Sequence, residues 1–207
     1  FLSGCQTYAT VTVNVTPIPF VNSISATPET ICAGSTSTLT AKALGPVQKV
    51  VQMGTETTST ATWAITPLTT VYEDQRSQYL INAEELTAMI VLPGPITSIA
   101  FNITTAGVTA NGFTIKIGFT STQAFTTENV YLPSPTNVVY GPQNFTPTVG
   151  WKTFNLSTPL IWDGTSAILI EVCFNNTSWS SSSAVETSVL SYKATLGGYD
   201  DGINNTC

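Results

Sequence analysis

Residues Gly4 to Pro19, GCQTYATVTVNVTPIP, carry the clearest strand pattern near the start of the sequence. Its apolar residues follow a nearly perfect two-residue spacing among threonines: Tyr8, Val11, Val13 and Val15. This period predicts a β-strand over residues 7–16, followed by a stiff linker at Pro17-Ile18-Pro19. The three residues before it offer no hairpin partner, and a lone strand is not stable in water. We therefore expect it to pair later in this chain or with another chain.

The composition excludes several classes of partner. With 207 residues and 42% hydrophobic content, the chain can form one or two domains with a buried core. Only 9% of the residues are charged, and six basic residues stand against twelve acidic ones. Because the basic residues are spread singly, nucleic acid and anionic membranes are not expected partners.

An extracellular location is expected. No apolar run approaches the roughly 20 residues that span a bilayer. No signal peptide is visible, so we interpret the chain as a processed or partial product of a longer secreted precursor.

Four cysteines without a CxxC pair favour disulfides over zinc, and three pairings are open to them. They are Cys5, Cys32, Cys173 and Cys207.

Changes in composition divide the chain into two expected parts. Residues 1–44 hold the N-terminal strand, the proline linker and short alternating stretches, whereas residues 45–207 hold strand-like runs separated by Gly, Pro and Asn. The expected strands of the second part are 47–53, 61–66, 79–82, 96–105, 112–119, 136–140, 151–156, 166–174 and 185–194. This spacing predicts an all-β, antiparallel, jelly-roll-like β-sandwich. A turn or short helix is expected within 77–88, and a long surface excursion over 125–147.

No catalytic or cofactor site is evident, and we expect no enzyme activity. The absence of histidine removes Ser-His-Asp and Cys-His catalysis together with the commonest metal ligand. Glycoside hydrolysis needs two carboxylates, and adjacent strand residues point to opposite faces. The sequence leaves open a pair formed across strands, but a surface role is favoured for the acids: Glu73, Asp74, Glu84, Glu85, Asp163 and Glu171.

Three polar motifs have structural interpretations. The Asp163-Gly164 step is interpreted as a strand-entry turn, and Arg76 as part of a local ion pair beside acids rather than as a ligand-binding group. The tail resembles a calcium loop in composition but lacks the ligand spacing of one, so a polar turn is favoured there. Its weak calcium candidates are Asp200, Asp201 and Asn204.

Aromatic rings and asparagines are the expected surface features. Trp151 and Trp162 have apolar neighbours in strand patterns and are predicted to lie in the core. Trp179 lies in a Ser-rich loop and is the candidate for ligand contact. Seven asparagines begin N-x-S/T sequons and are glycosylation candidates if the producing cell modifies such motifs. They are Asn14, Asn102, Asn144, Asn155, Asn175, Asn176 and Asn204.

Parts of the chain resemble giant cell-surface proteins of Bacteroidota, including gliding-type adhesins. SGCQTYATVTVNVTPIP is similar to the last strands of their immunoglobulin-like repeats, and SATPETICAGSTSTLTA to the first strands of the next repeat, while the middle strands are absent. From Gln52 onward the chain resembles a β-rich module of the same proteins, most specifically in the WDGTS and EVCFNN blocks.

This resemblance implies a secreted jelly-roll-like sandwich with Cys173 bridged to Cys207. Cys5 and Cys32 are then left to each other, within one chain or between neighbours. The resembling module brings no established catalytic residues. That module usually continues past its last cysteine into another strand, and here the sequence departs from it. The orphan first strand and the missing middle strands leave two interpretations: a fragment of a long multidomain chain, or a subunit whose first strand is free to bind the next copy.

We therefore expect a non-enzymatic structural subunit or module of an extracellular fibre or adhesin. It would join other copies head-to-tail through its N-terminal strand region, or adjoin neighbouring domains of a larger protein. The alternative is a carbohydrate-binding adhesive module at the end of a surface stalk, with glycans as partners.

Overall fold

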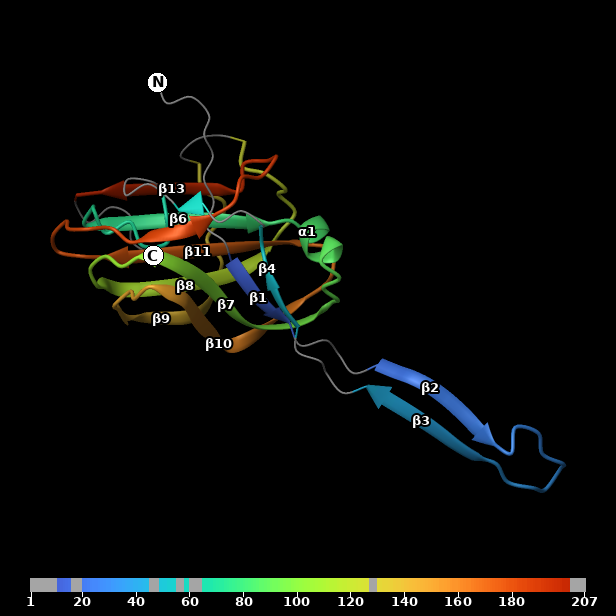
Figure 1. The fold of residues 1–207 in the computed structure, drawn as a ribbon. Helices are drawn as coiled ribbons and strands as arrows, with labels where there is room; N and C mark the ends of the chain where they lie inside the picture. The colour runs from blue at the N-terminus through green and yellow to red at the C-terminus, as the bar shows by residue number, and fades with distance from the viewer. Residues whose placement is uncertain are drawn as a thin grey trace.

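Two antiparallel β-sheets pack face to face, and a two-stranded hairpin extends from one end of them (Figure 1). The structure is a computed structural model, and it describes residues 11–15, 20–44, 49–54, 58–59, 65–126 and 130–201. The architecture confirms the predicted all-β antiparallel sandwich.

The first sheet is organised around β7 (Gly94–Thr105), and we call it the β7 sheet. On one side β7 pairs with β10 (Gly150–Trp162), and on the other side it pairs with β1 and β12. Two further strands lie beyond these, since β4 pairs with β1 and β5 pairs with β12. The shorter strands are β1 (Val11–Val15), β4 (Lys49–Gln52), β5 (Thr58–Ser59) and β12 (Ala184–Thr187).

The second sheet, the β11 sheet, has the strand order β13-β6-β11-β8-β9. Its strands are β6 (Asp74–Ile81), β8 (Ala110–Thr120), β9 (Asn137–Phe145), β11 (Ala167–Asn175) and β13 (Thr195–Asp200). The central strand β11 is buried on both faces except at its last residue, which explains its nearly continuous apolar sequence, AILIEVCFN.

The main core lies between the two sheets and is rich in aromatic rings. Phe154 of β10 is its centre, with ring centroids 4.8 Å from Tyr140, 5.1 Å from Phe145, 5.5 Å from Phe113 and 6.1 Å from Phe101. The rings are tilted or edge-on, which is the favoured geometry for aromatic pairs. Trp162 is also fully buried here, as the sequence predicted.

The N-terminal strand pairs within this chain. Val13 of β1 lies opposite Ile99 of β7 on one side and opposite Val51 of β4 on the other, antiparallel to both. This is one of the two pairings that the sequence left open. The sequence predicted that this strand belongs to an N-terminal unit over residues 1–44. The strand is part of the sandwich instead, so the strand pairings cross the predicted boundary at residue 44.

The region from 74 to 88 holds a strand that covers most of the expected strand 79–82, followed by the short helix expected within 77–88. Strand β6 continues to Ile81, and the helix α1 (Ala83–Ala88) is only six residues long. At its start the Glu85 carboxylate accepts a hydrogen bond from the Asn82 N–H at 3.0 Å, which marks where the strand ends and the helix begins. Within the described residues, no helix has the length and apolar character needed to cross a bilayer.

Strand β13 was not predicted, because its sequence TLGGYD contains two glycines typical of turns. The glycine at 197 has a packing reason: a Cβ there would lie 2.3 Å from Cγ2 of Ile65. The strand expected over 185–194 is correspondingly short, since β12 ends at Thr187. Most of the strand expected over 61–66 lies outside the described residues, and residues 65 and 66 are not in a strand.

The predicted surface excursion over 125–147 partly covers the outer face of the β11 sheet. Phe125 is buried with Leu80, Leu169 and Leu196 in a second hydrophobic cluster, against which Tyr131, Leu132 and Tyr192 pack. This cover accounts for the burial of β11 on its outer face. The sequence predicted a surface excursion around one strand; β9 is that strand, but the first part of the segment is partly buried.

Candidate interaction surfaces

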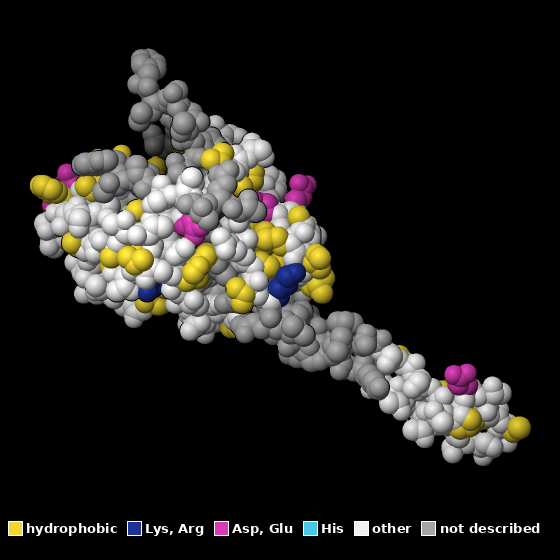
Figure 2. All heavy atoms as spheres, viewed as in Figure 1, with side chains coloured by type: hydrophobic (Ala, Val, Ile, Leu, Met, Phe, Trp, Pro, Cys, Tyr) yellow, Lys and Arg dark blue, Asp and Glu magenta, His cyan; other side chains and the backbone are white. Residues whose placement is uncertain are grey.

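The hairpin, which we call the hairpin arm (residues 20–44), is the most exposed element of the described chain. It consists of β2 (Phe20–Thr27) and β3 (Thr38–Leu44), which pair antiparallel with each other and with no other strand in the described part. Figures 1 and 2 show it extending clear of the sandwich. A two-stranded hairpin without further packing is at best marginally stable in water.

The two faces of the arm differ in chemistry. Ile24 lies opposite Ala41, and Ala26 lies opposite Leu39; opposite residues share a face, so these four form one apolar face. The other face carries hydroxyls, because Ser25 lies opposite Thr40 and Thr27 opposite Thr38. Ile24 is 71% exposed and Leu39 is 74% exposed. The apolar face is therefore uncovered.

The tip of the arm, residues 28–37, is held by local hydrogen bonds. The backbone N–H of Ser35 donates to the carbonyl of Cys32 at 3.0 Å, and the Ser37 hydroxyl donates to the carbonyl of Pro28 at 2.6 Å. Glu29 and Ile31 are exposed here.

The cysteines do not follow the expected pairing in full. Cys32 is a free and exposed thiol, so a disulfide between Cys32 and Cys5 within one chain is wrong. Cys173 is buried in β11 and is disulfide-bonded, but its partner lies outside the described residues. Cys5 and Cys207 also lie outside them, and the Cys173–Cys207 bridge stays a prediction.

A second exposed apolar surface lies at the end of the sandwich from which the arm extends. We call it the end patch, and it consists of Lys49, Ile90 and Leu92. The Lys49 ammonium donates to the carbonyl of Ile90 at 3.2 Å and also to that of Met89, which fixes it beside the apolar side chains. Figure 2 shows hydrophobic side chains next to a basic one at this end.

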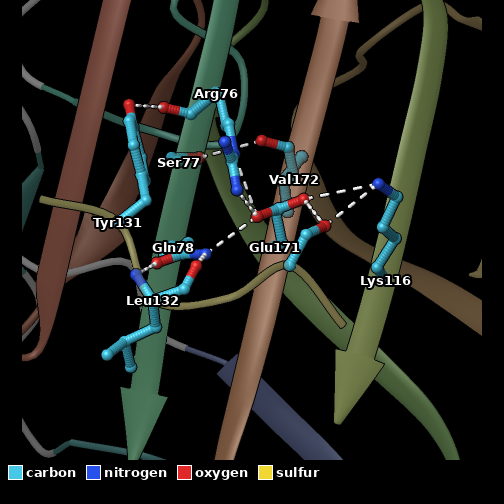
Figure 3. Close-up of polar contacts among 9 residues, drawn as sticks. Arg76, Ser77, Gln78, Lys116, Tyr131, Leu132, Glu171 and Val172 are labelled. Atoms are coloured by element: carbon cyan, nitrogen blue, oxygen red, sulfur yellow. Dashed lines mark hydrogen bonds and ion pairs between the residues drawn. The ribbon is translucent and has the colours of Figure 1, made fainter. Parts of the chain in front are cut away.

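A buried charge network lies on the outer face of the β11 sheet (Figure 3). The side chain of Glu171 is 0% exposed. Its Oε2 accepts hydrogen bonds from Arg76 Nη2 at 2.7 Å, Arg76 Nε at 2.9 Å and Gln78 Nε2 at 2.8 Å. Its Oε1 accepts from Ser134 Oγ at 2.5 Å and faces Lys116 Nζ at 3.5 Å.

Arg76, which belongs to this network, also makes two contacts with Tyr131. The guanidinium lies 4.4 Å from the centroid of the Tyr131 ring, and the Tyr131 hydroxyl donates to the Arg76 carbonyl at 2.9 Å. Burial raises the pKa of Glu171, but hydrogen bonds from Ser134, Arg76 and Gln78 and the charge of Arg76 outweigh it and lower that pKa. The carboxylate therefore stays ionised and fully bonded, which suits a structural role rather than proton transfer.

The sequence anticipated a structural pair for Arg76 but not its partner. Arg76 was expected to pair locally beside Glu73 and Asp74, whereas its partner is Glu171, 95 residues away. No local sequence signal joins the two, because strand register brings them together: Cys173 lies opposite Arg76, and Glu171 lies opposite Gln78.

Two further acids, Asp163 and Glu85, have structural environments. Asp163 accepts hydrogen bonds from the backbone N–H groups of Thr165 and Ser166 at 2.8 and 2.7 Å, which confirms the predicted turn. These bonds and that of the Ser166 hydroxyl lower the pKa of Asp163. Glu85 accepts from the Asn82 N–H and the Tyr192 hydroxyl.

The calcium candidates in the tail are only partly described. Asp201 accepts from the Glu73 N–H at 3.3 Å, and Asp200 accepts from the Asp201 N–H, while Asn204 lies outside the described residues. Within the part of the chain that the structure describes, no group of three or more His, Cys, Asp or Glu side chains could hold a metal ion.

The tryptophans occupy contrasting positions. Trp179 is 67% exposed, as predicted. The prediction that Trp151 lies in the core is wrong, because β10 buries Phe154, Leu156, Leu160 and Trp162 and turns its odd-numbered residues outward. Trp63 lies outside the described residues.

The sequons differ in accessibility. Asn144, Asn155 and Asn175 are exposed. Asn176 is buried, with its amide bonded to the backbone of Asn111 and Thr109, and Asn102 donates to Glu186. The side chain of Asn14 and all of Asn204 lie outside the described part.

Comparisons with known proteins give no match. No protein-family model matches the chain, and neither a curated protein nor a solved structure does. The resemblance to surface proteins of Bacteroidota therefore stays a prediction, and a function has to be argued from the surfaces themselves.

Proposed function

We propose that the chain is a non-enzymatic structural subunit of an extracellular fibre or adhesin, and that it joins other copies through the hairpin arm. The observation that carries this proposal is the uncovered apolar face of the arm, which has no partner strand among the described residues. Because β1 is already paired on both sides, the arm replaces the first strand as the connecting element. Low charge and a disulfide-bonded Cys173 support an extracellular, oxidising location.

Self-association fits the chemistry of the arm better than binding of a small ligand. A flat two-stranded surface encloses no cavity, but it can add to a second sheet or pack against an apolar surface of another molecule. Ile24 and Leu39 together leave two large aliphatic side chains in water, and burying each of them fully is worth about 1.5–3 kcal/mol. Such a contact can repeat head-to-tail between many copies or close between two copies.

Sedimentation velocity over a range of protein concentrations tests this proposal. Wild-type protein should associate as its concentration rises, and Leu39→Ser should weaken that association roughly tenfold or more, since the leucine contact is lost. Val149→Ser is the matched control, because Val149 is also exposed but lies between β9 and β10 at the opposite end of the sandwich. A wild-type protein that stays monomeric at all concentrations would overturn the proposal.

A second candidate function is glycan binding, and the exposed Trp179 ring favours it. Exposed aromatic faces can stack on apolar faces of ligands, and this ring lies at the end of the sandwich opposite the arm. A glycan array probed with wild type and Trp179→Ala separates the two functions. Binding that the variant loses would establish the glycan function, whereas binding at background in both would remove it.

A further inference from the structure

We propose that the arm of one copy docks on the end patch of a second copy, and that the two copies exchange arms reciprocally. This inference rests on the proposed function, because it names the surface that receives the arm. The occupant is a second copy of this chain, because the charge, the apolar surface and the position of the arm match those of the end patch.

Charge at the arm tip is complementary to charge at the end patch. Glu29 is exposed and is the one charged residue in the tip sequence PETICAGSTS, residues 28–37. Lys49 is half-buried in the end patch, and no ion pair joins it to a carboxylate within the described residues. A docked tip would bring Glu29 to Lys49 and lay the exposed side chain of Ile31 beside Ile90 and Leu92.

Ile90 has a left-handed backbone conformation, although its exposed side chain is β-branched. It has a φ of +57°, which is costly for a β-branched residue. It occupies the position after the C-cap of α1: its N–H donates to the Thr87 carbonyl, and the Val91 N–H donates to the Leu86 carbonyl. Glycine is the usual residue there. The Ile90 side chain is 73% exposed, so it adds little to the core while presenting an apolar group to solvent.

The position of the two surfaces predicts a closed contact. The end patch lies where the arm begins, because Lys49 starts β4 directly after the residues that follow β3. Two copies can therefore lie with their arms antiparallel, each tip on the end patch of the other copy. In this arrangement Ile24, nearer the base of one arm, faces Leu39, nearer the tip of the other. Such an isologous contact closes as a dimer.

Ile90→Gly tests the end patch without weakening the fold. Glycine removes the apolar side chain and relieves the left-handed strain, so the melting temperature of the sandwich should stay level or rise. The dimer dissociation constant, measured by sedimentation velocity, should rise roughly tenfold or more. A charge exchange adds a second readout: Glu29→Lys and Lys49→Glu should each weaken the dimer, and the double variant should restore it in part, because a carboxylate at position 49 cannot donate to the Met89 and Ile90 carbonyls.

The outcomes separate this inference from the proposed function. A monomeric wild type overturns both. Association that Leu39→Ser weakens but Ile90→Gly leaves unchanged overturns the end patch and retains the arm. Species larger than a dimer in the wild type overturn the reciprocal closure. Loss of the dimer in Leu39→Ser and in Ile90→Gly, together with recovery of the dimer in the double charge-exchange variant, supports the arrangement in full.

Discussion

Replacing Glu171 with glutamine should remove much of the stability of the β11 sheet. The substitution keeps the size of the side chain but removes the charge that Arg76 and Lys116 face at 2.7 and 3.5 Å. The glutamine amide also places an N–H₂ group where a carboxylate oxygen accepts hydrogen bonds in the wild type. This group cannot accept those hydrogen bonds. The variant therefore tests whether the network in Figure 3 is a structural element of the sandwich.

The magnitude follows from the burial of the three charges. Removing one partner of a buried ion pair costs about 3–5 kcal/mol. The Arg76 and Lys116 side chains keep 23% and 14% exposure, so water can partly solvate them when the carboxylate is gone. We therefore expect the lower end of that range, about 3 kcal/mol, which corresponds to a fall in melting temperature of roughly 6–12 °C.

Urea unfolding followed by tryptophan fluorescence, to which the buried Trp162 contributes, measures this loss. Glu84→Gln is the matched control, because Glu84 is exposed on α1, and its variant should unfold like the wild type. The pKa of Glu171 is lowered in the folded state, so its contribution is present above the unfolded value of about 4.3 and is lost as the pH falls through the folded value. The difference between wild type and Glu171→Gln should therefore shrink in acid. A loss below about 1 kcal/mol near neutral pH would refute the structural role.

Three further predictions concern the core, the turn and the arm. Phe154→Ala should cost about 3–5 kcal/mol in urea unfolding, because four aromatic rings surround it, and a cost near zero would contradict the described core. Asp163→Ala should lower the melting temperature near neutral pH, and by less in acid. The pKa of Asp163 is lowered in the folded state, so its stabilising contribution disappears as the pH falls. An equal fall in melting temperature at both pH values would argue against the hydrogen bonds of the turn. Cys32 should react with a thiol reagent in the native protein, and Cys32→Ser should unfold like the wild type; a thiol that reacts only after unfolding would contradict its exposure.

Much of the sandwich could be predicted from local patterns in the sequence. The strands expected over 96–105, 112–119 and 166–174 coincide closely with β7, β8 and β11, because their apolar spacing is dense and bounded by turns. The turn at Asp163 was also predictable, since its hydrogen bonds are made within three residues.

Long-range register accounts for what the sequence did not reveal. The pairing of β1 with β4 and β7 and the contact between Arg76 and Glu171 join segments that no local signal connects. The outward position of Trp151 could have been found, because it is out of phase with Phe154 in the two-residue period of β10. The exposed side chain of Ile90 depends on a left-handed backbone that the sequence AMIVL does not indicate.

Amide hydrogen exchange at several protein concentrations distinguishes pairing of β1 within its own chain from pairing of the arm between copies. We expect the amides of β1 to be protected at every concentration, because β1 is paired within its own chain. The amides of the arm, residues 20–44, should exchange fast in dilute protein and become protected as copies associate. Protection of β1 that appears only at high concentration, with no change in the arm, would contradict the account.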